Sequence, residues 1–386
     1  MVSTESSLFN AAKEGVRMRE GWEYKTIEKC TSIEYGTRVV QKRDGGTIYP
    51  VYGGGGETFR MDRYNREDCL IIARFAMSPR CVRYVAGKFF LNDSGLSVKS
   101  KEELEQAYLN YHLLFFNDVI YHLGKGAAQR NLDVKAFRQL VIAIPPKSTQ
   151  LSIVSELDKL NELIRIKKEQ LKDYDTLAQS IFYEMFGDPV ENEKGWEVKE
   201  LIETVSPECK ISYGIVQPGE HVEDGVSIVR PVDMVSTFIS KDGLKKTTKE
   251  ISNSYSRTIL SGKELLVCVR GTTGIVSLVD ESLQGANVTR GIAPLLFSEN
   301  VERWFMYYQV KSSSVRGVIS SLTRGIALKQ INMSDLRKIR LILPPLSLQQ
   351  SFAHKIEQIE HQKAAVQRTI KDLETLLAVR MQYWFE

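Results

Sequence analysis

The sequence lacks the features of a secreted or membrane protein. Its five cysteines are scattered through 386 residues, and no pair has the CxxC spacing. This pattern favours free thiols in a reducing compartment over a disulfide framework or a zinc site. No apolar run approaches the ~20 residues of a membrane span, and residues 1–20 do not resemble a signal peptide. We therefore expect a soluble, cytoplasmic protein that does not associate with membranes.

Motifs for catalysis and nucleotide binding are also missing. The sequence contains no GxxxxGK[ST], no HExxH, no GxSxG and no [ND]PP[YF]. One pattern typical of metal-dependent nucleases remains, Asp188 followed by Glu197 and Lys199. The segment Glu23–Lys25 repeats its second part without an aspartate at the matching distance. A shared strand at the start of two related domains therefore explains Glu197 and Lys199 better than a metal site does.

The sequence does contain one pattern twice. Residues 144–160 read IPPKSTQLSIVSELDKL, and residues 343–359 read LPPLSLQQSFAHKIEQI. The proline pair, the serine and the glutamine match at an offset of 199, which holds without a gap from Gly126 to Phe186. A repeat of this length predicts a tandem duplication.

Each copy predicts a long helix. The proline pair ends a strand, and Ser148 and Ser347 lie where an N-cap is expected, with Gln350 completing a capping box in the second copy. Each helix of about 35 residues would span roughly 50 Å. Apolar residues then recur at alternating spacings of four and three, a narrow seam typical of a coiled coil. The seam consists of Leu157, Leu160, Ile164, Leu171, Ile181, Ile356, Ile359, Val366, Ile370, Leu373 and Leu377. Since each seam is too narrow to be buried alone, we expect the two helices to pair.

The remaining sequence predicts two globular domains of mixed α/β (α+β) structure. Each opens with Gly-Trp-Glu and contains a buried strand that ends in an arginine, Arg74 or Arg270. Residues 21–145 contain 18 Lys and Arg against 14 Asp and Glu, and residues 201–345 contain the same numbers, so the positive excess lies in the globular parts. That distribution suggests a polyanion partner. The predicted divisions are an N-terminal segment 1–20, a first domain 21–146, a helix 147–188, a second domain 195–345 and a helix 346–386.

The order of these parts resembles the specificity subunits of type I DNA restriction–modification systems. The resemblance covers nearly the whole chain, and it includes the segments Tyr49–Gly56, Gly126–Gln129, Ser212–Gly219 and Val269–Gly274. It implies a non-catalytic subunit with two target-recognition domains, each reading one half of an asymmetric DNA site. The helices would pair antiparallel with pseudo-two-fold symmetry, set the spacer and dock two methyltransferase subunits. S-adenosylmethionine, ATP and Mg²⁺ would act in those subunits and in restriction subunits, so we expect no cofactor in this chain.

We expect the DNA-facing groups at the ends of strands and in Gly-rich loops, because guanidinium, ammonium and amide groups contact both phosphates and bases. The candidates are Arg60, Arg63, Arg74, Lys125, Arg130, Tyr213, Gln217, Lys245, Lys246, Arg270, Gly271, Thr272, Arg290, Arg316 and Arg324. Two alternatives remain open: a stand-alone Mg²⁺-dependent nuclease that uses Asp188, Glu197 and Lys199, and a coiled-coil scaffold without a nucleic-acid role.

Overall fold

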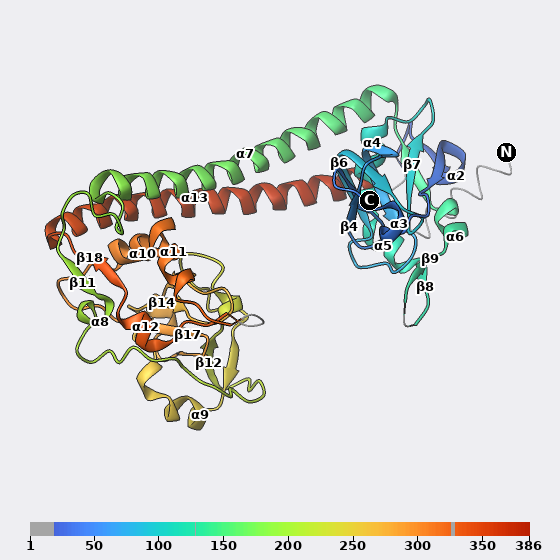
Figure 1. Ribbon diagram of the computed structural model, residues 1–386. Helices are drawn as coiled ribbons and strands as arrows, with labels where there is room; N and C mark the ends of the chain where they lie inside the picture. Colours follow the sequence, from blue (N-terminus) through green and yellow to red (C-terminus); the bar gives the residue numbers. More distant parts are fainter. Residues whose placement is uncertain (1–18, 128, 326–328) are drawn as a thin grey trace. The chain divides into compact units, whose positions relative to one another are not determined.

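The computed structural model describes residues 19–127, 129–325 and 329–386. The predicted N-terminal segment therefore lies outside the described residues except for its last two, and so does Ala128 of the Gly126–Gln129 segment. The chain forms two compact units (Figure 1). Unit 1 comprises Met1–Lys168 and Arg368–Glu386, and unit 2 comprises Glu169–Gln367.

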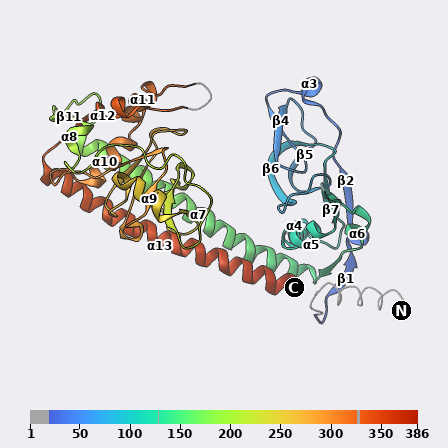
Figure 2. The same ribbon diagram turned by 90° about the horizontal axis from the view of Figure 1, so that it is seen from below.

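Two long helices of equal length contribute to both units. Helix α7 covers Lys147–Phe186 and helix α13 covers Leu346–Phe385, 40 residues each. They run side by side in opposite directions (Figures 1 and 2). In unit 1 the start of α7 and the end of α13 enter one core, through Ile153 and Phe385. In unit 2 the roles are exchanged, and the core includes Phe352 and Phe186. The predicted antiparallel pairing is confirmed.

The N-cap of each long helix lies two residues before the serine predicted for it, at Pro146 in α7 and Pro345 in α13. The first amide bonds of α7 run from Thr149 and Gln150 to the carbonyl of Pro146, and α13 repeats this with Pro345. Ser148 and Ser347 therefore lie inside the first turn, and their prediction as N-caps is wrong. A proline is tolerated at this point because N–H groups at the start of a helix have no partner within the helix, so the absence of an N–H on proline breaks no helical hydrogen bond.

All eleven residues of the predicted seam are buried or half-buried. Near its end, however, α7 buries Phe182 and Phe186 more deeply than Ile181. Here the helix packs on its domain instead of following a coiled-coil seam, and Phe186 contacts the ring of Phe305 at 4.8 Å between centroids. Lys363 is also buried in the seam, where its ammonium lies 2.9 Å from Asp175 of α7 and 2.7 Å from Glu360.

Unit 1 is built on a six-stranded sheet of order β2-β7-β5-β6-β3-β4. Two further antiparallel pairs, β1 with β10 and β8 with β9, lie outside this sheet. The strands are β1 Glu23–Thr26, β2 Thr31–Tyr35, β3 Tyr49–Tyr52, β4 Glu57–Met61, β5 Arg66–Ala73, β6 Val82–Leu91, β7 Gly95–Ser100, β8 Gly124–Lys125, β9 Asn131–Leu132 and β10 Val141–Ile144. The shorter helices are α2 Ile27–Cys30, α3 Gln41–Asp44, α4 Gln106–Phe115, α5 Asn117–His122 and α6 Val134–Gln139.

Unit 2 contains two three-stranded sheets, β15-β14-β17 and β13-β12-β16, and the pair β11-β18. The strands are β11 Val198–Glu200, β12 Val226–Val229, β13 Lys245–Thr247, β14 Leu265–Cys268, β15 Val276–Leu278, β16 Asn287–Val288, β17 Ile292–Leu295 and β18 Arg340–Ile342. The shorter helices are α8 Leu201–Thr204, α9 Lys249–Ser254, α10 Arg303–Lys311, α11 Ser313–Ser321 and α12 Met333–Arg337, and three 3₁₀ turns cover Pro231–Asp233, Ser256–Thr258 and Glu281–Leu283.

A common frame relates the two units. The pairing of β1 with β10 is repeated by β11 with β18, so that Tyr24 opposite Ala143 corresponds to Val198 opposite Ile342. The central strand β5, with β6 and β7 beside it, corresponds to β14 with β15 and β17. Both central strands end in four buried residues, as their apolar sequences predict.

All five cysteines are free thiols, as predicted. Burial raises the pKa of Cys30, Cys81 and Cys268 to about 11, so these thiols stay protonated at neutral pH. Within the described ranges, no helix combines the length and the apolar character needed to cross a membrane.

Candidate nucleic-acid interface

In unit 1 a short hairpin lies beside the end of the central strand. Strands β8 and β9 form this hairpin, which extends away from the rest of the unit (Figure 1). The amide of Leu132 donates to the carbonyl of Arg74 at 2.9 Å, and the amide of Met77 donates to Arg130 at 2.9 Å. The chain leaving β5 is thus fixed to the hairpin, which carries two basic residues, Lys125 and Arg130.

Unit 2 repeats this arrangement. The amide of Ile331 donates to Val269 at 3.0 Å, and the amide of Gly271 donates to Lys329 at 2.8 Å. Arg324 pairs with Gln330 as Lys125 pairs with Asn131. At the offset of 199, Lys125 corresponds to Arg324 and Arg130 to Lys329. We call these four residues the hairpin cations. Each unit therefore places two positive charges at the same two positions of the same hairpin.

The hairpin cations are accessible to a ligand to different degrees. Lys125 is 79% exposed and lies 2.5 Å from Asp133, while Arg324 is 75% exposed and lies 3.4 Å from Asp335. The Lys125 ammonium lowers the pKa of Asp133, which also caps α6. Because such exposed ion pairs contribute little to stability, a phosphate can replace the carboxylate at small cost. Lys329 is exposed as well, whereas Arg130 is half-buried with its guanidinium 4.8 Å from the Tyr121 ring centre.

Arg74 and Arg270 do not occupy equivalent positions, contrary to the prediction from their strands. The hydrogen bonds of Arg74 to Ser94 and Leu132 match those of Val269 to Gly291 and Ile331. Arg270 therefore corresponds to Phe75, one residue further along. The cause is the buried run, which ends at Ala73 in unit 1 but continues through Val269 in unit 2. Arg74 packs on aromatic rings, with its guanidinium 4.5 Å from the Phe75 ring centre.

Around Arg270 the structure brings several predicted residues together. Arg270 pairs with Gln330 of the hairpin, and Gly271 and Thr272, the next residues of the chain, are exposed. Gly291 lies against Arg270, and its neighbour Arg290 donates its amide to the carbonyl of Ile215. That bond joins the 212–219 loop, which presents Tyr213 and Gln217 as exposed side chains.

Other candidates have structural partners or lie on separate elements. The ammonium groups of Lys245 and Lys246 donate to the carbonyls of Gly219 and Glu223, so they fix the neighbouring loop. Arg60 donates to the carbonyl of Ile48. Arg63 lies 5.6 Å from the Phe90 ring centre, and Arg316 is exposed on α11. Sequence reasoning missed Lys329, although its offset from Arg130 marks it.

The alternative nuclease site has a structural explanation. The carboxylate of Asp188 accepts the amides of Val190 and Glu191, which closes a turn after α7. Glu197 and Lys199 lie at the entry strand and are 3.4 Å apart. Among the residues the structure describes, no three His, Cys, Asp or Glu side chains gather in a way that could hold a metal ion.

Comparisons with known proteins agree on one family. The family model described as type I restriction modification DNA specificity domain matches residues 20–173 and 212–375. The EcoBI specificity subunit of a type I restriction enzyme from Escherichia coli is 25% identical over 227 residues, 58% of this chain and 43% of that protein. The MjaVIII specificity subunit from Methanocaldococcus jannaschii is 24% identical over 311 residues, 72% of this chain and 70% of that protein. This chain thus matches less than half of the length of the E. coli relative.

Two solved structures share the fold. The S subunit of a type I restriction–modification system from M. genitalium has a TM-score of 0.54 at 14% identity, with 96% of this chain and 98% of that chain covered. A chain from a study of complex assembly in the type I system has a TM-score of 0.56 at 18% identity, with 95% and 98% covered. Since the family model matches most of the sequence in two separate copies, this chain belongs to the family of type I restriction–modification DNA specificity domains.

Proposed function

We propose that this chain reads a bipartite DNA sequence for a type I restriction–modification complex. The observation that carries the proposal is the repeated hairpin, with basic residues at the same two positions beside the end of each central strand. Phosphates are the natural partners of exposed ammonium and guanidinium groups, and contacts to them set the position of a protein on DNA.

Each unit would read one half of the site. The frame is common to both units, but the segment before the central strand differs, with residues 36–65 in unit 1 and 206–264 in unit 2. Two different segments on one frame would recognise two different half-sites, which makes the whole target asymmetric. Arg270, Arg290, Tyr213 and Gln217 are the base-contacting candidates of unit 2.

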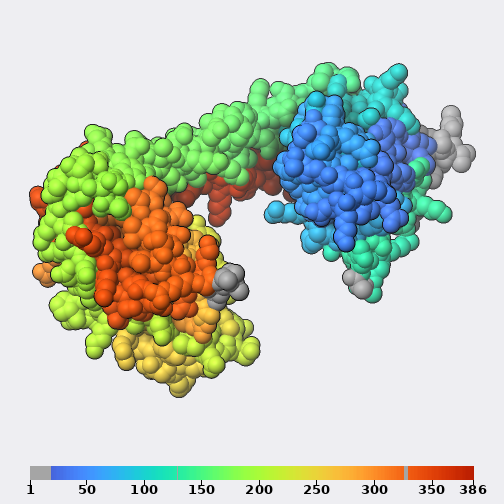
Figure 3. All heavy atoms as spheres, viewed as in Figure 1, coloured from blue at the N-terminus to red at the C-terminus, as the bar shows by residue number. Residues whose placement is uncertain are grey.

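The long helices would set the distance between the half-sites. Forty residues span roughly 60 Å at 1.5 Å per residue, which exceeds the ~34 Å of one DNA turn. In Figure 3 one side of α7 forms a band of exposed atoms. Leu177 of α7 and Leu376 of α13, which are 199 residues apart, are 47% and 45% exposed. Two repeated apolar positions suit two copies of one partner, which we identify with the modification subunits.

The chemistry would belong to those partners. Modification subunits would bind S-adenosylmethionine and methylate adenine, and restriction subunits would use ATP and Mg²⁺. This chain would supply recognition and assembly and would remain non-catalytic itself.

Sequencing of methylated bases in cells with and without this chain tests the proposal. We expect one asymmetric, bipartite motif to be methylated only when the chain is present together with its modification subunits. A methylome that does not depend on the chain, together with no DNA binding by the assembled complex, would favour the scaffold alternative.

A further inference from the structure

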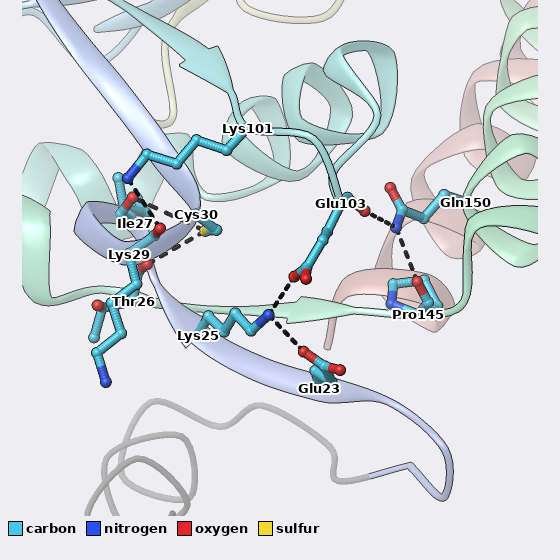
Figure 4. Close-up of polar contacts among 10 residues, drawn as sticks. All are labelled: Glu23, Lys25, Thr26, Ile27, Lys29, Cys30, Lys101, Glu103, Pro145 and Gln150. Atoms are coloured by element: carbon cyan, nitrogen blue, oxygen red, sulfur yellow. Dashed lines mark hydrogen bonds and ion pairs between the residues drawn. The ribbon is translucent and has the colours of Figure 1, made fainter. Parts of the chain in front are cut away.

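The glutamine of the repeated proline motif joins three segments in unit 1. Gln150 lies in the first turn of α7 and is 1% exposed. Its side-chain carbonyl accepts the amide of Glu105, the N-cap of α4, at 2.7 Å. Its amide nitrogen donates to the carbonyl of Glu103 at 3.0 Å and to that of Pro145 at 2.8 Å (Figure 4). We call this set of three hydrogen bonds the glutamine bridge.

The same bridge is present in unit 2. Gln349 is fully buried and accepts the amide of Glu302, the N-cap of α10, at 2.9 Å. It donates to Pro344 at 2.7 Å and to Asn300 at 3.4 Å. The two bridges thus use the same three kinds of partner at equivalent places.

Only a glutamine satisfies such a site. A primary amide offers one acceptor and two donor hydrogens, and each of them has a partner here. Glutamate lacks the donors, and an apolar residue of similar length leaves the helix N-cap amide and two carbonyls without partners. Orphaned buried groups of this kind are costly, which explains why the motif ends in the same residue in both copies.

The bridge also receives support from the loop it contacts in unit 1. Lys25 on β1 binds the carboxylates of Glu23 and Glu103, and thereby holds the loop whose carbonyl Gln150 uses (Figure 4). In unit 2, Asn300 occupies the place of Glu103, and its side chain accepts the hydroxyl of Ser298 at 2.6 Å. The loop is fixed in both units, by an ion pair in one and by a neutral bond in the other.

From these contacts we infer that Gln150 and Gln349 are positioning residues for DNA recognition. Each fixes the direction in which a long helix leaves its own domain, because it ties the first helical turn both to the residue just before the helix and to the loop before a domain helix, α4 or α10. This inference rests on the proposed function, in which the helices set the spacer. Loosening a bridge should therefore relax the spacer requirement and leave the half-site sequences unchanged.

The test uses the assembled methyltransferase and duplexes that carry the two half-sites found by methylome sequencing. The spacer is natural, one base pair longer or one base pair shorter. Gln150→Met and Gln349→Met should reduce the preference for the natural spacer by about tenfold, equivalent to about 1.4 kcal/mol. Gln150→Asn and Gln349→Asn keep the amide but have a shorter side chain. These variants are tested in the same way if the methionine variants do not fold.

Gln309→Met provides the matched control in unit 2. Gln309 is also fully buried, but it bonds Ile342 of β18 and not the helix. It should lower the thermal midpoint without changing spacer preference. An unchanged preference in every bridge variant, or an equal change in the control, would overturn the inference. Failure of the unmutated complex to bind these duplexes would instead refute the proposed function.

Discussion

The two units of this chain share one structural frame and differ in one segment. Both have the same entry and closing strands, the same central strand with its two neighbours, and the same hairpin with two basic residues. Both use a buried glutamine to begin a long helix. What is repeated has the same task in both units, so these elements are expected to bind the helix and the phosphates and not to distinguish bases.

The difference lies in the segment before the central strand, residues 36–65 in unit 1 and 206–264 in unit 2. In unit 1 this segment adds β3 and β4 to the main sheet, whereas in unit 2 it contributes β12 and β13 to a separate sheet, which β16 completes from beyond the central strand. Two unlike inserts at one point of a common frame are suited to reading two unlike sequences. The predictions below test this division between shared frame and variable insert.

The largest effect is expected at the hairpin cations. Replacing Lys125 and Arg130 by Ala, or Arg324 and Lys329 by Ala, should weaken binding to all sequences similarly. The slope of log affinity against log salt should fall by about 1.8 for each pair, since each lost phosphate contact contributes about 0.9. Equilibrium binding of the assembled complex at several salt concentrations measures this.

Lys159→Ala, on the exposed surface of α7, serves as the control. A double variant that changed base preference but not the salt slope would show that the hairpin reads bases. That result would contradict the division between a shared frame and a variable insert.

A smaller and less symmetrical effect is expected at Arg74 and Arg270. Because the two arginines are offset by one residue, their alanine variants should behave differently. Arg270→Ala should cost about 1–3 kcal/mol at one base pair, whereas Arg74→Ala, which removes a packed guanidinium, should weaken binding without changing base preference. Binding to a panel of single-base variants of the site distinguishes these outcomes, and identical profiles for both mutants would contradict the offset.

The third prediction concerns pH and another pair of equivalent residues. His112 is fully buried in unit 1 and accepts a hydrogen bond from the amide of Ala143. At the equivalent place in unit 2, Gln309 accepts a hydrogen bond from the amide of Ile342. Among the described groups, the Nδ1 atom of His112 is buried without a partner. Burial lowers the pKa of His112 to about 3. Below pH ~6.5 His112 binds a proton in the unfolded chain but not in the folded chain, so folding stability falls with falling pH.

This loss should approach about 1.4 kcal/mol per pH unit between pH ~6.5 and the lowered pKa. His112→Gln should remove that part of the acid sensitivity, and Gln309→His should introduce it in unit 2. Urea unfolding at pH 7.0, 6.0 and 5.0 measures the change. Parallel pH profiles for wild type and His112→Gln would show that this histidine is protonated without cost.

Much of the frame could be predicted because the chain contains its own internal comparison. The 199-residue offset and the proline pairs indicate both helices, and the helix bounds observed here differ by that same offset. The central strands could be predicted from unbroken apolar runs. The serine caps failed because a proline already begins each helix, and the deep burial of Phe182 depends on the domain that α7 packs against.

The candidate interface was less accessible from sequence. Strands of two residues, such as β8 and β9, have no periodicity to recognise, and the hydrogen bonds that place the hairpin beside the central strand join residues distant in the sequence. The partners of Lys245 and Lys246 are backbone carbonyls distant in the sequence, which no pattern of side chains reveals. The role of Gln150 is hidden for the same reason.

The central claim is that the chain consists of two equivalent recognition units. It is tested most directly by expressing only residues 1–188 with the modification subunits and sequencing the methylated bases. Phe186 corresponds to Phe385, so the end of α7 from a second copy can fill the place that α13 occupies in unit 1. We predict a homodimer that methylates a palindrome made of one half-site twice, with a similar spacer. Methylation that persists at the original asymmetric site would contradict the account.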